Sequence, residues 1–313
     1  MSAAREKRKL AYTSTERTDN IVEEILPLLY FCNVLKLKIS MILDIKLPKI
    51  GLALGGGGAR GYAHVGVIKA LERNRIPIDY IAGTSAGALM GCLYAFFKDS
   101  QKLEEVTLST HWRQFITLLD PSFCSDGIIE GKKIKEFIGQ FIEQTTFDQL
   151  KIPFRAVATD FKTAQTVELS EGDVAFAVRA SISYPLFFKP VPWQDKLLLD
   201  GGLSSPVPVN TVRKMGADIV IAVNLDNESY FENGENSKMT LFQIAVISIH
   251  SLQYHLAKEC VKSADVVIEP KIKDVGLLGL DKFVNKRGQA IILEGERLTE
   301  AIIPEIKKII LPK

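Results

Sequence analysis

The sequence predicts a three-layer α/β/α domain with a mainly parallel central sheet. From Lys49 onward, short apolar runs alternate with segments of helical apolar spacing, which is typical of parallel strands covered by helices on both faces. Two glycine-rich segments, GGGGARG and GTSAG, each stand between a strand-like run and a helical segment. The length of 313 residues accommodates one large domain with appendages.

The first two pairs of strand and helix follow one another directly. IGLAL, residues 50–54, is strand-like, and HVGVIKALER, residues 64–73, is helical. IDYIAGTS, residues 78–85, is the second predicted strand, and AGALMGCLYAFF, residues 86–97, is its helix. Residues 103–149 carry helical spacing around a turn-rich stretch, DPSFCSDG, and so predict further helices over the sheet.

The second half of the chain continues the alternation. Its predicted strands are FRAVATDF, TVEL, KLLLDGG, ADIVIAVNLD and ADVVIEP. Its predicted helices are VAFAVRASIS, which closes before Pro185, a segment from Leu241 to Val261, and a last segment from about Asn285 to Ile303. A polar stretch, NESYFENGENSK, predicts a surface loop before the Leu241 helix.

Composition and charge exclude several classes of protein. The 39 basic and 37 acidic residues give a formal net charge of +2, too balanced for the basic footprint of a nucleic-acid binder. Four cysteines lie far apart without a CxxC pair, which argues against a disulfide framework and a zinc site and favours a reducing, cytoplasmic setting. The apolar stretch of residues 25–35 is too short to cross a bilayer.

The first glycine motif has the composition of an anion-binding loop. Within GGGGARG, Gly56, Gly58 and Gly61 satisfy GxGxxG, and the backbone N–H groups of such a loop can bind a dinucleotide pyrophosphate or an oxyanion. A dinucleotide site also needs an acidic residue at the end of the next strand, whereas that strand ends here in Thr84 and Ser85. A glycine turn needed only for tight packing is the third interpretation.

The second glycine motif places Ser85 within GxSxG, directly before an apolar helix. This is the context of a nucleophile elbow, in which small flanking residues, here Gly83, Ala86 and Gly87, let the serine occupy a sharp turn with its hydroxyl exposed. The alternative is that Ser85 only caps the helix. Together with the glycine loop, the motif favours a catalytic serine.

A serine nucleophile needs a base, and the histidines are poorly placed to provide one. None of them stands at the end of a predicted strand before a loop; they are His64, His111, His250 and His255. We interpret His64 as a packing or helix-positioning residue. Asp200 is better placed, because it ends an apolar run and precedes Gly201 and Gly202, which let the backbone pass close to a ligand. Asp200 is therefore the candidate base.

These motifs, in this order, resemble the patatin-like phospholipase family. The resemblance covers residues 50–225, includes GGGGARGYAHVG, RASISYP and DGGLSSPVPV, and is nearest to the compact bacterial members. It implies that Ser85 is the nucleophile and Asp200 its base. It implies an oxyanion hole made of three backbone amides, those of Gly56, Gly57 and Gly58. The supporting motif residues are Arg60, Gly61, Gly83, Gly87, Gly201 and Gly202.

The segment around Pro185 departs from the family pattern. The family often has a smaller residue before this proline, whereas this chain has Tyr184, and three apolar residues follow, Leu186, Phe187 and Phe188. Apolar residues between positions 181 and 191 are candidates for lining an acyl channel. The departure leaves the shape of that channel undetermined.

The resemblance implies a metal-independent hydrolase of lipid esters, phospholipids or lysophospholipids, with no cofactor. The predicted setting is cytoplasmic, with peripheral contact to the membrane in which such substrates reside, no nucleic acid as partner, and an oligomeric state left open. Two noncatalytic alternatives use the same glycine loop: a regulator that binds nucleotides and one that binds lipids.

Three parts of the chain are predicted. Residues 1–47 form an N-terminal extension, for which a dispensable segment, an interfacial helix and a packed surface helix are the alternatives. Residues 48–225 form the catalytic domain. Residues 226–313 form a C-terminal helical segment with one short strand that packs on the catalytic domain.

Overall fold

The computed structural model describes residues 47–109, 121–124, 127–129, 131–142, 144–226, 240–272 and 287–310. The predictions for residues 1–46, for His111 and for the polar stretch 227–238 lie outside these ranges. No helix in the described ranges is both long and apolar enough to cross a membrane.

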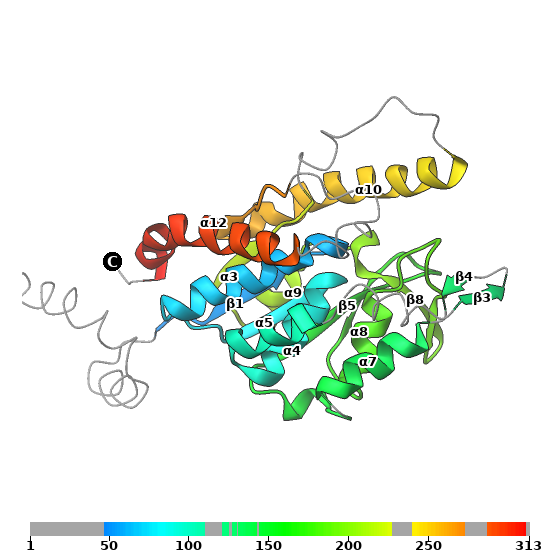
Figure 1. The fold of residues 1–313 in the computed structure, drawn as a ribbon, viewed down its shortest axis with the longest axis horizontal. Coiled ribbons are helices and arrows are strands. Elements are labelled where there is room, and N and C mark those ends of the chain that lie inside the picture. Colours follow the sequence, from blue (N-terminus) through cyan, green and yellow to red (C-terminus); the bar gives the residue numbers. More distant parts are fainter. Residues whose placement is uncertain are drawn as a thin grey trace, which may run out of the picture.

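An eight-stranded sheet forms the centre of the fold (Figure 1). The strands run in the order β10-β9-β1-β2-β5-β8-β7, with β6 also paired to β5. Five strands pair in parallel: β1 (Ile50–Leu54), β2 (Tyr80–Thr84), β5 (Phe154–Asp160), β9 (Ile219–Val223) and β10 (Val266–Ile268). Three strands pair antiparallel at the β5 side: β6 (Thr166–Leu169), β7 (Val191–Trp193) and β8 (Lys196–Asp200). A separate two-stranded sheet joins β3 (Pro121–Cys124) and β4 (Gly127–Ile129).

Helices surround this sheet. The α-helices are α3 (Tyr62–Arg73), α4 (Ala86–Phe97), α5 (Ser100–Ser109), α7 (Lys132–Ile142), α8 (Val174–Ser181), α9 (Val209–Lys214), α10 (Leu241–Cys260) and α12 (Arg287–Ile310). The 3-10 turns are η1 (Gly58–Gly61), η2 (Phe147–Gln149), η3 (Gly201–Leu203) and η5 (Val261–Ser263).

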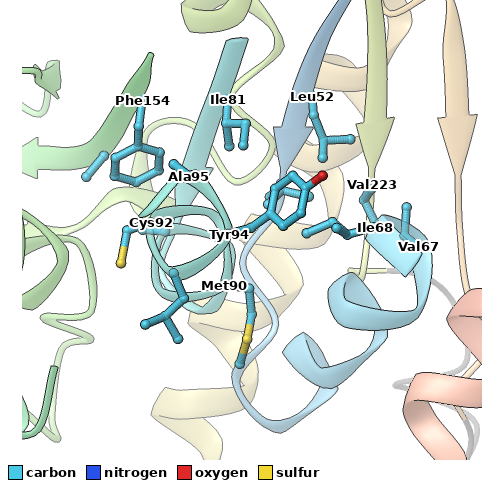
Figure 2. Close-up of a cluster of buried hydrophobic side chains, with 14 of the residues drawn as sticks. Leu52, Val67, Ile68, Ile81, Met90, Cys92, Tyr94, Ala95, Phe154 and Val223 are labelled. Carbon is cyan, nitrogen blue, oxygen red and sulfur yellow. The ribbon is translucent and has the colours of Figure 1, made fainter. Parts of the chain in front are cut away.

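Alternate residues of the parallel strands face two different helical layers. On one face, large side chains such as Leu52, Ile81 and Val223 pack against α3 and α4 in the main core (Figure 2). On the other face, the small residues Ala53 and Ala82 pack against α9 and the end of α10. Because side chains alternate along a strand and both faces are covered, the strands β1 and β9 contain no polar side chain. The predicted three-layer α/β/α architecture is confirmed.

The last helix, α12, packs closely against α3. Helix α12 lies along α3 (Figure 1). At their contact a Cβ on Gly66 would lie 1.9 Å from the Ile292 carbonyl oxygen, and a Cβ on Gly295 would lie 2.3 Å from the Ala63 carbonyl oxygen. Only glycine permits this approach, so two glycines set the distance between the helices.

The extent of that last helix differs from the prediction. The predicted helix ends near Ile303, whereas the observed helix continues through Pro304 to Ile310. Proline removes one helical hydrogen bond. Ile303, Ile306 and Ile310 are all buried at helical spacing, and this burial offsets the lost bond. The short elements β7 and α9 were not predicted, since each has too few residues to show a period.

Candidate active site

The strand register brings Ser85 and Asp200 to the same end of the sheet. Strand β5 lies between β2 and β8. Thr84 pairs with Val157 of β5, and Asp200 pairs with the next residue, Ala158. The turn after Asp200 then crosses towards the serine, because a Cβ on Gly201 would lie 3.1 Å from Cγ2 of Thr84. Ser85 and Asp200 therefore lie on opposite sides of β5, at nearly the same level along this strand.

Ser85 has the backbone conformation of a nucleophile elbow. Its φ is 52° and its ψ is −119°, a left-handed conformation that is costly for a residue with a side chain. Ser85 stands at the N-cap position of α4, but its side chain makes no capping hydrogen bond. The capping role considered from the sequence therefore does not account for this serine, and its half-buried hydroxyl is not used by the helix end.

The elbow is held from behind by Ser181. The Ser85 backbone N–H donates to Oγ of Ser181 at 2.9 Å, and the Ser181 hydroxyl donates to the carbonyl oxygen of Val157 at 2.6 Å. A hydroxyl has one proton to donate. Ser181 therefore links the elbow to strand β5 by accepting one hydrogen bond and donating its single proton in another. Ser181 is fully buried at the end of α8.

Replacing Ser181 by alanine tests this link. The Ser85 N–H and the Val157 carbonyl would each lose a partner, which costs about 1–3 kcal/mol for a buried group. We expect Ser181→Ala to lower the free energy of unfolding by that amount and to lower kcat about tenfold, measured by urea unfolding and ester hydrolysis. Ser248→Ala is the control, because Ser248 is exposed on α10. A kcat equal to that of the control would contradict the positioning role.

The glycine loop after β1 packs directly against the elbow. A Cβ on Gly56 would lie 3.6 Å from the Ser85 Cβ, and a Cβ on Gly61 would lie 2.7 Å from the Ala86 Cβ. Gly87 lies under the loop, where a Cβ would lie 2.2 Å from the Leu54 carbonyl oxygen. The two glycine motifs of the sequence therefore pack directly against each other at the candidate site.

The loop amides are not equivalent. The Gly56 N–H donates to the Pro206 carbonyl oxygen at 2.9 Å, so this amide anchors the loop to the segment before α9. The N–H groups of Gly57 and Gly58 have no acceptor in the described ranges. Gly58 is exposed with φ 53°. The three amides of the predicted oxyanion hole therefore differ in their hydrogen bonding, and their role in binding an oxyanion stays a prediction.

His64 binds the start of the glycine loop by a hydrogen bond. It is fully buried on α3, and its Nε2 lies 2.8 Å from the Gly55 carbonyl oxygen. A carbonyl only accepts, so Nε2 carries the proton. Burial lowers the pKa of His64 to about 4, and the ring is therefore neutral at pH 7. This contact agrees with a helix-positioning role.

Asp200 is buried, and its two carboxyl oxygens differ in their hydrogen bonding. Oδ1 accepts the Gly202 N–H at 2.7 Å. Oδ2 is buried and has no hydrogen-bond partner of ordinary geometry in the described ranges. Burial raises the pKa of Asp200 to about 7, and the negative charge of Asp226 adds to the rise, while the Ser85 hydroxyl and the Gly202 amide oppose it. The carboxylate is thus close to the Ser85 hydroxyl and poised to take up a proton near neutral pH.

The remaining histidines have other surroundings. His250 is buried, with Nε2 3.3 Å from Nη2 of Arg60 and 3.6 Å from Oδ1 of Asp226. His255 is exposed on α10. Arg60 is itself buried, and its Nη2 donates to Asp226 at 2.9 Å. In the described part of the chain, no group of three or more His, Cys, Asp or Glu side chains could hold a metal ion.

Comparison with known proteins shows the family of this chain. A sequence model described as Patatin-like phospholipase matches residues 52–213, more than half of the chain. The chain belongs to the patatin-like phospholipase family. The predicted resemblance is confirmed.

Several relatives are longer than this chain. An uncharacterised NTE family protein of Mycobacterium tuberculosis is 39% identical over 185 residues, 57% of this chain and 49% of that protein. Patatin-like phospholipase domain-containing protein 6 of Homo sapiens is 31% identical over 186 residues, 57% of this chain and 13% of that protein. The chain therefore spans about half the length, or less, of these relatives.

A solved structure shares the fold at low identity. VipD from Legionella pneumophila superposes with a TM-score of 0.54 and 15% identity, over 83% of this chain and 67% of that chain. The match supports the α/β architecture of a patatin-like domain.

Two residues of the site were not predicted from the sequence. Ser181 lies within RASISYP, but nothing local indicates that its hydroxyl reaches Ser85. Asp226 does carry a signal, because it comes shortly after the buried parallel strand β9, as Ser85 comes directly after the parallel strand β2. The rule that polar residues at strand ends meet at one sheet edge would have found it.

Proposed function

We propose that this protein hydrolyses lipid carboxylic esters with Ser85 as nucleophile and Asp200 as base. The observation that carries the proposal is the buried Oδ2 of Asp200, which accepts no hydrogen bond of ordinary geometry in the described ranges and belongs to a carboxyl group whose pKa the nearby Ser85 hydroxyl lowers. A strained serine beside an unoccupied, basic carboxylate oxygen is the arrangement of an activated nucleophile.

The proposed mechanism has two acyl-transfer steps. Ser85 Oγ attacks the ester carbonyl carbon while its proton passes to Asp200, and the Gly57 and Gly58 amides stabilise the oxyanion. The tetrahedral intermediate collapses, the C–O bond to the alcohol breaks, and Asp200 returns the proton to the departing alcohol. Water then attacks the acyl-serine and Asp200 takes its proton. The second tetrahedral intermediate collapses, the acyl–Oγ bond breaks, and Asp200 passes that proton to Ser85 Oγ as the acid is released. Loss of one oxyanion donor costs about 3–4 kcal/mol in comparable sites.

Apolar side chains beside Asp200 support a substrate with an acyl chain. The Asp200 N–H donates to the Ser183 carbonyl oxygen, so the segment after Ser183 begins next to the base. The Phe187 ring in that segment contacts the Phe242 ring edge-on, with centroids 5.4 Å apart, and Leu186 is 40% exposed. We infer that this apolar surface receives the acyl chain of a phospholipid or lysophospholipid and contacts the membrane peripherally.

Labelling with a fluorophosphonate probe tests the proposed chemistry. We expect wild-type protein to be labelled at Ser85, as shown by mass mapping of the adduct, and Ser85→Ala to remain unlabelled. Ser248→Ala is the matched control and should label like wild type. Folded wild-type protein that resists the probe but binds a nucleotide or a lipid saturably would favour the noncatalytic alternatives instead.

A further inference from the structure

Arg60 is buried beneath the glycine loop. It belongs to η1, and its side chain is 6% exposed. Nη1 donates to the Leu225 carbonyl oxygen at 2.5 Å, and Nη2 donates to Oδ1 of Asp226 at 2.9 Å. Nη2 also lies 3.3 Å from Nε2 of His250 on α10. All three partners lie beyond residues 52–213, the part that the family model matches.

The same side chain binds the carbonyl oxygen of Gly57. Nε of Arg60 donates to this oxygen at 3.3 Å, and the backbone N–H of Arg60 donates to it at 3.0 Å. Because a trans peptide is planar, the Gly57 C=O and the Gly58 N–H point in opposite directions. Fixing the Gly57 carbonyl therefore fixes the direction of the Gly58 amide.

The order of the strands indicates in which direction the Gly58 N–H points. Strands β9 and β2 flank β1 on opposite sides. Leu225 and Asp226, which hold Arg60, follow β9, whereas Ser85 follows β2. A Gly57 carbonyl drawn towards the β9 side leaves the Gly58 N–H facing the β2 side, where the serine lies. No atom lies within 4 Å of a Cβ built on Gly58, so the space beside this residue is open.

We propose that Arg60 is the positioning residue of the oxyanion hole, and that Asp226 and His250 hold it in place. The inference rests on the proposed function, because it assumes that Ser85 forms an acyl-enzyme. Arg60 acts through the Gly58 amide and does not contact the substrate. Asp226 balances the buried positive charge, which would otherwise be strongly unfavourable.

In this network His250 is a neutral acceptor. Guanidinium N–H groups only donate, so Nε2 of His250 accepts from Arg60. Burial and the adjacent Arg60 charge lower the pKa of His250 to about 3, which keeps the ring uncharged at pH 7. A loss of activity on changing His250 would therefore not identify it as the base of a triad.

Arg60→Lys tests the proposal, because lysine keeps the charge but lacks the guanidinium geometry that joins Gly57 to Asp226. Fluorophosphonate titration of the full-length protein counts the competent Ser85 sites, and hydrolysis of a soluble p-nitrophenyl ester gives kcat per titrated site. We expect kcat per site to fall at least about tenfold, with KM changed less than about threefold. Arg73→Lys is the control, since the Arg73 side chain is 59% exposed and pairs with Glu296 and Glu300.

Two results for Arg60→Lys would overturn the proposal. An unchanged kcat per titrated site, even with less folded protein, would leave Arg60 a purely structural role. A raised KM with unchanged kcat would make Arg60 a substrate-binding residue. Wild-type protein that is not labelled at Ser85 would refute the proposed function itself, before any Arg60 variant is compared.

A pair of His250 variants tests the network if Arg60→Lys fails to fold. Glutamine can offer Arg60 an acceptor oxygen in place of Nε2, whereas leucine cannot. We expect His250→Gln to keep kcat per titrated site within about fivefold of wild type and His250→Leu to lose at least about tenfold. Equal loss in both variants would make the imidazole itself necessary and would overturn the proposal.

Discussion

Replacing Asp200 by asparagine is expected to lower kcat by at least about 10³-fold while the fold is retained. The asparagine amide has the same shape and can still accept the Gly202 N–H, but it cannot take the proton of Ser85. Hydrolysis of a soluble ester measures the loss, and circular dichroism reports the fold. Wild-type activity in a folded Asp200→Asn protein would contradict the dyad.

The pH dependence of wild-type activity follows from the same carboxyl group. The pKa of Asp200 is raised to about 7, and only the ionised form is a base. We therefore expect kcat/KM to rise with pH up to about 7 and to level off above it. A profile that is flat between pH 5 and 8 would show that Asp200 is not the group that titrates in catalysis.

The burial of Asp200 affects the stability of the folded protein in the opposite direction to its activity as pH rises. A raised carboxyl pKa means that the folded state binds a proton more tightly than the unfolded state, so stability is lost as pH rises from about 4 to about 7. This loss amounts to about 4 kcal/mol at most, at 1.36 kcal/mol for each pKa unit. At pH 8, Asp200→Asn removes the buried charge, and we expect its urea midpoint to equal or exceed that of wild type.

Replacing Gly87 by alanine is expected to destabilise the protein by about 4 kcal/mol or more, or to prevent folding. A Cβ at Gly87 would lie 2.2 Å from the Leu54 carbonyl oxygen and 2.6 Å from the Gly55 carbonyl oxygen. Both are backbone atoms where β1 passes into the glycine loop, so neither can move without displacing this loop from Ser85. Urea unfolding measures the effect.

Gly139→Ala is the matched control for that substitution. Gly139 lies within α7, where an added Cβ meets no atom within 4 Å. Alanine is the better helix former, so we expect a change between zero and about 1 kcal/mol in favour of the folded state. If Gly87→Ala unfolds at the same urea concentration as this control, the loop and the elbow are not as closely packed as their glycines indicate.

The sequence predicted the fold and the candidate dyad because both depend on local patterns. Alternating strands and helices give the parallel sheet, and the glycines around Ser85 and after Asp200 mark the ends of two strands. The family match agrees with this interpretation over residues 52–213. The catalytic roles of Ser85 and Asp200 stay predictions, and the labelling and substitution experiments test them.

Only the tertiary structure decided how the glycine loop after β1 is used. It assigned the Gly56 amide to Pro206 and left the Gly57 and Gly58 amides without an acceptor in the described ranges. It placed Arg60 against Leu225 and His250, which are 165 and 190 residues away in the sequence. A local pattern records the conformation of a few neighbouring residues, whereas hydrogen bonds over such separations depend on the order and register of the strands.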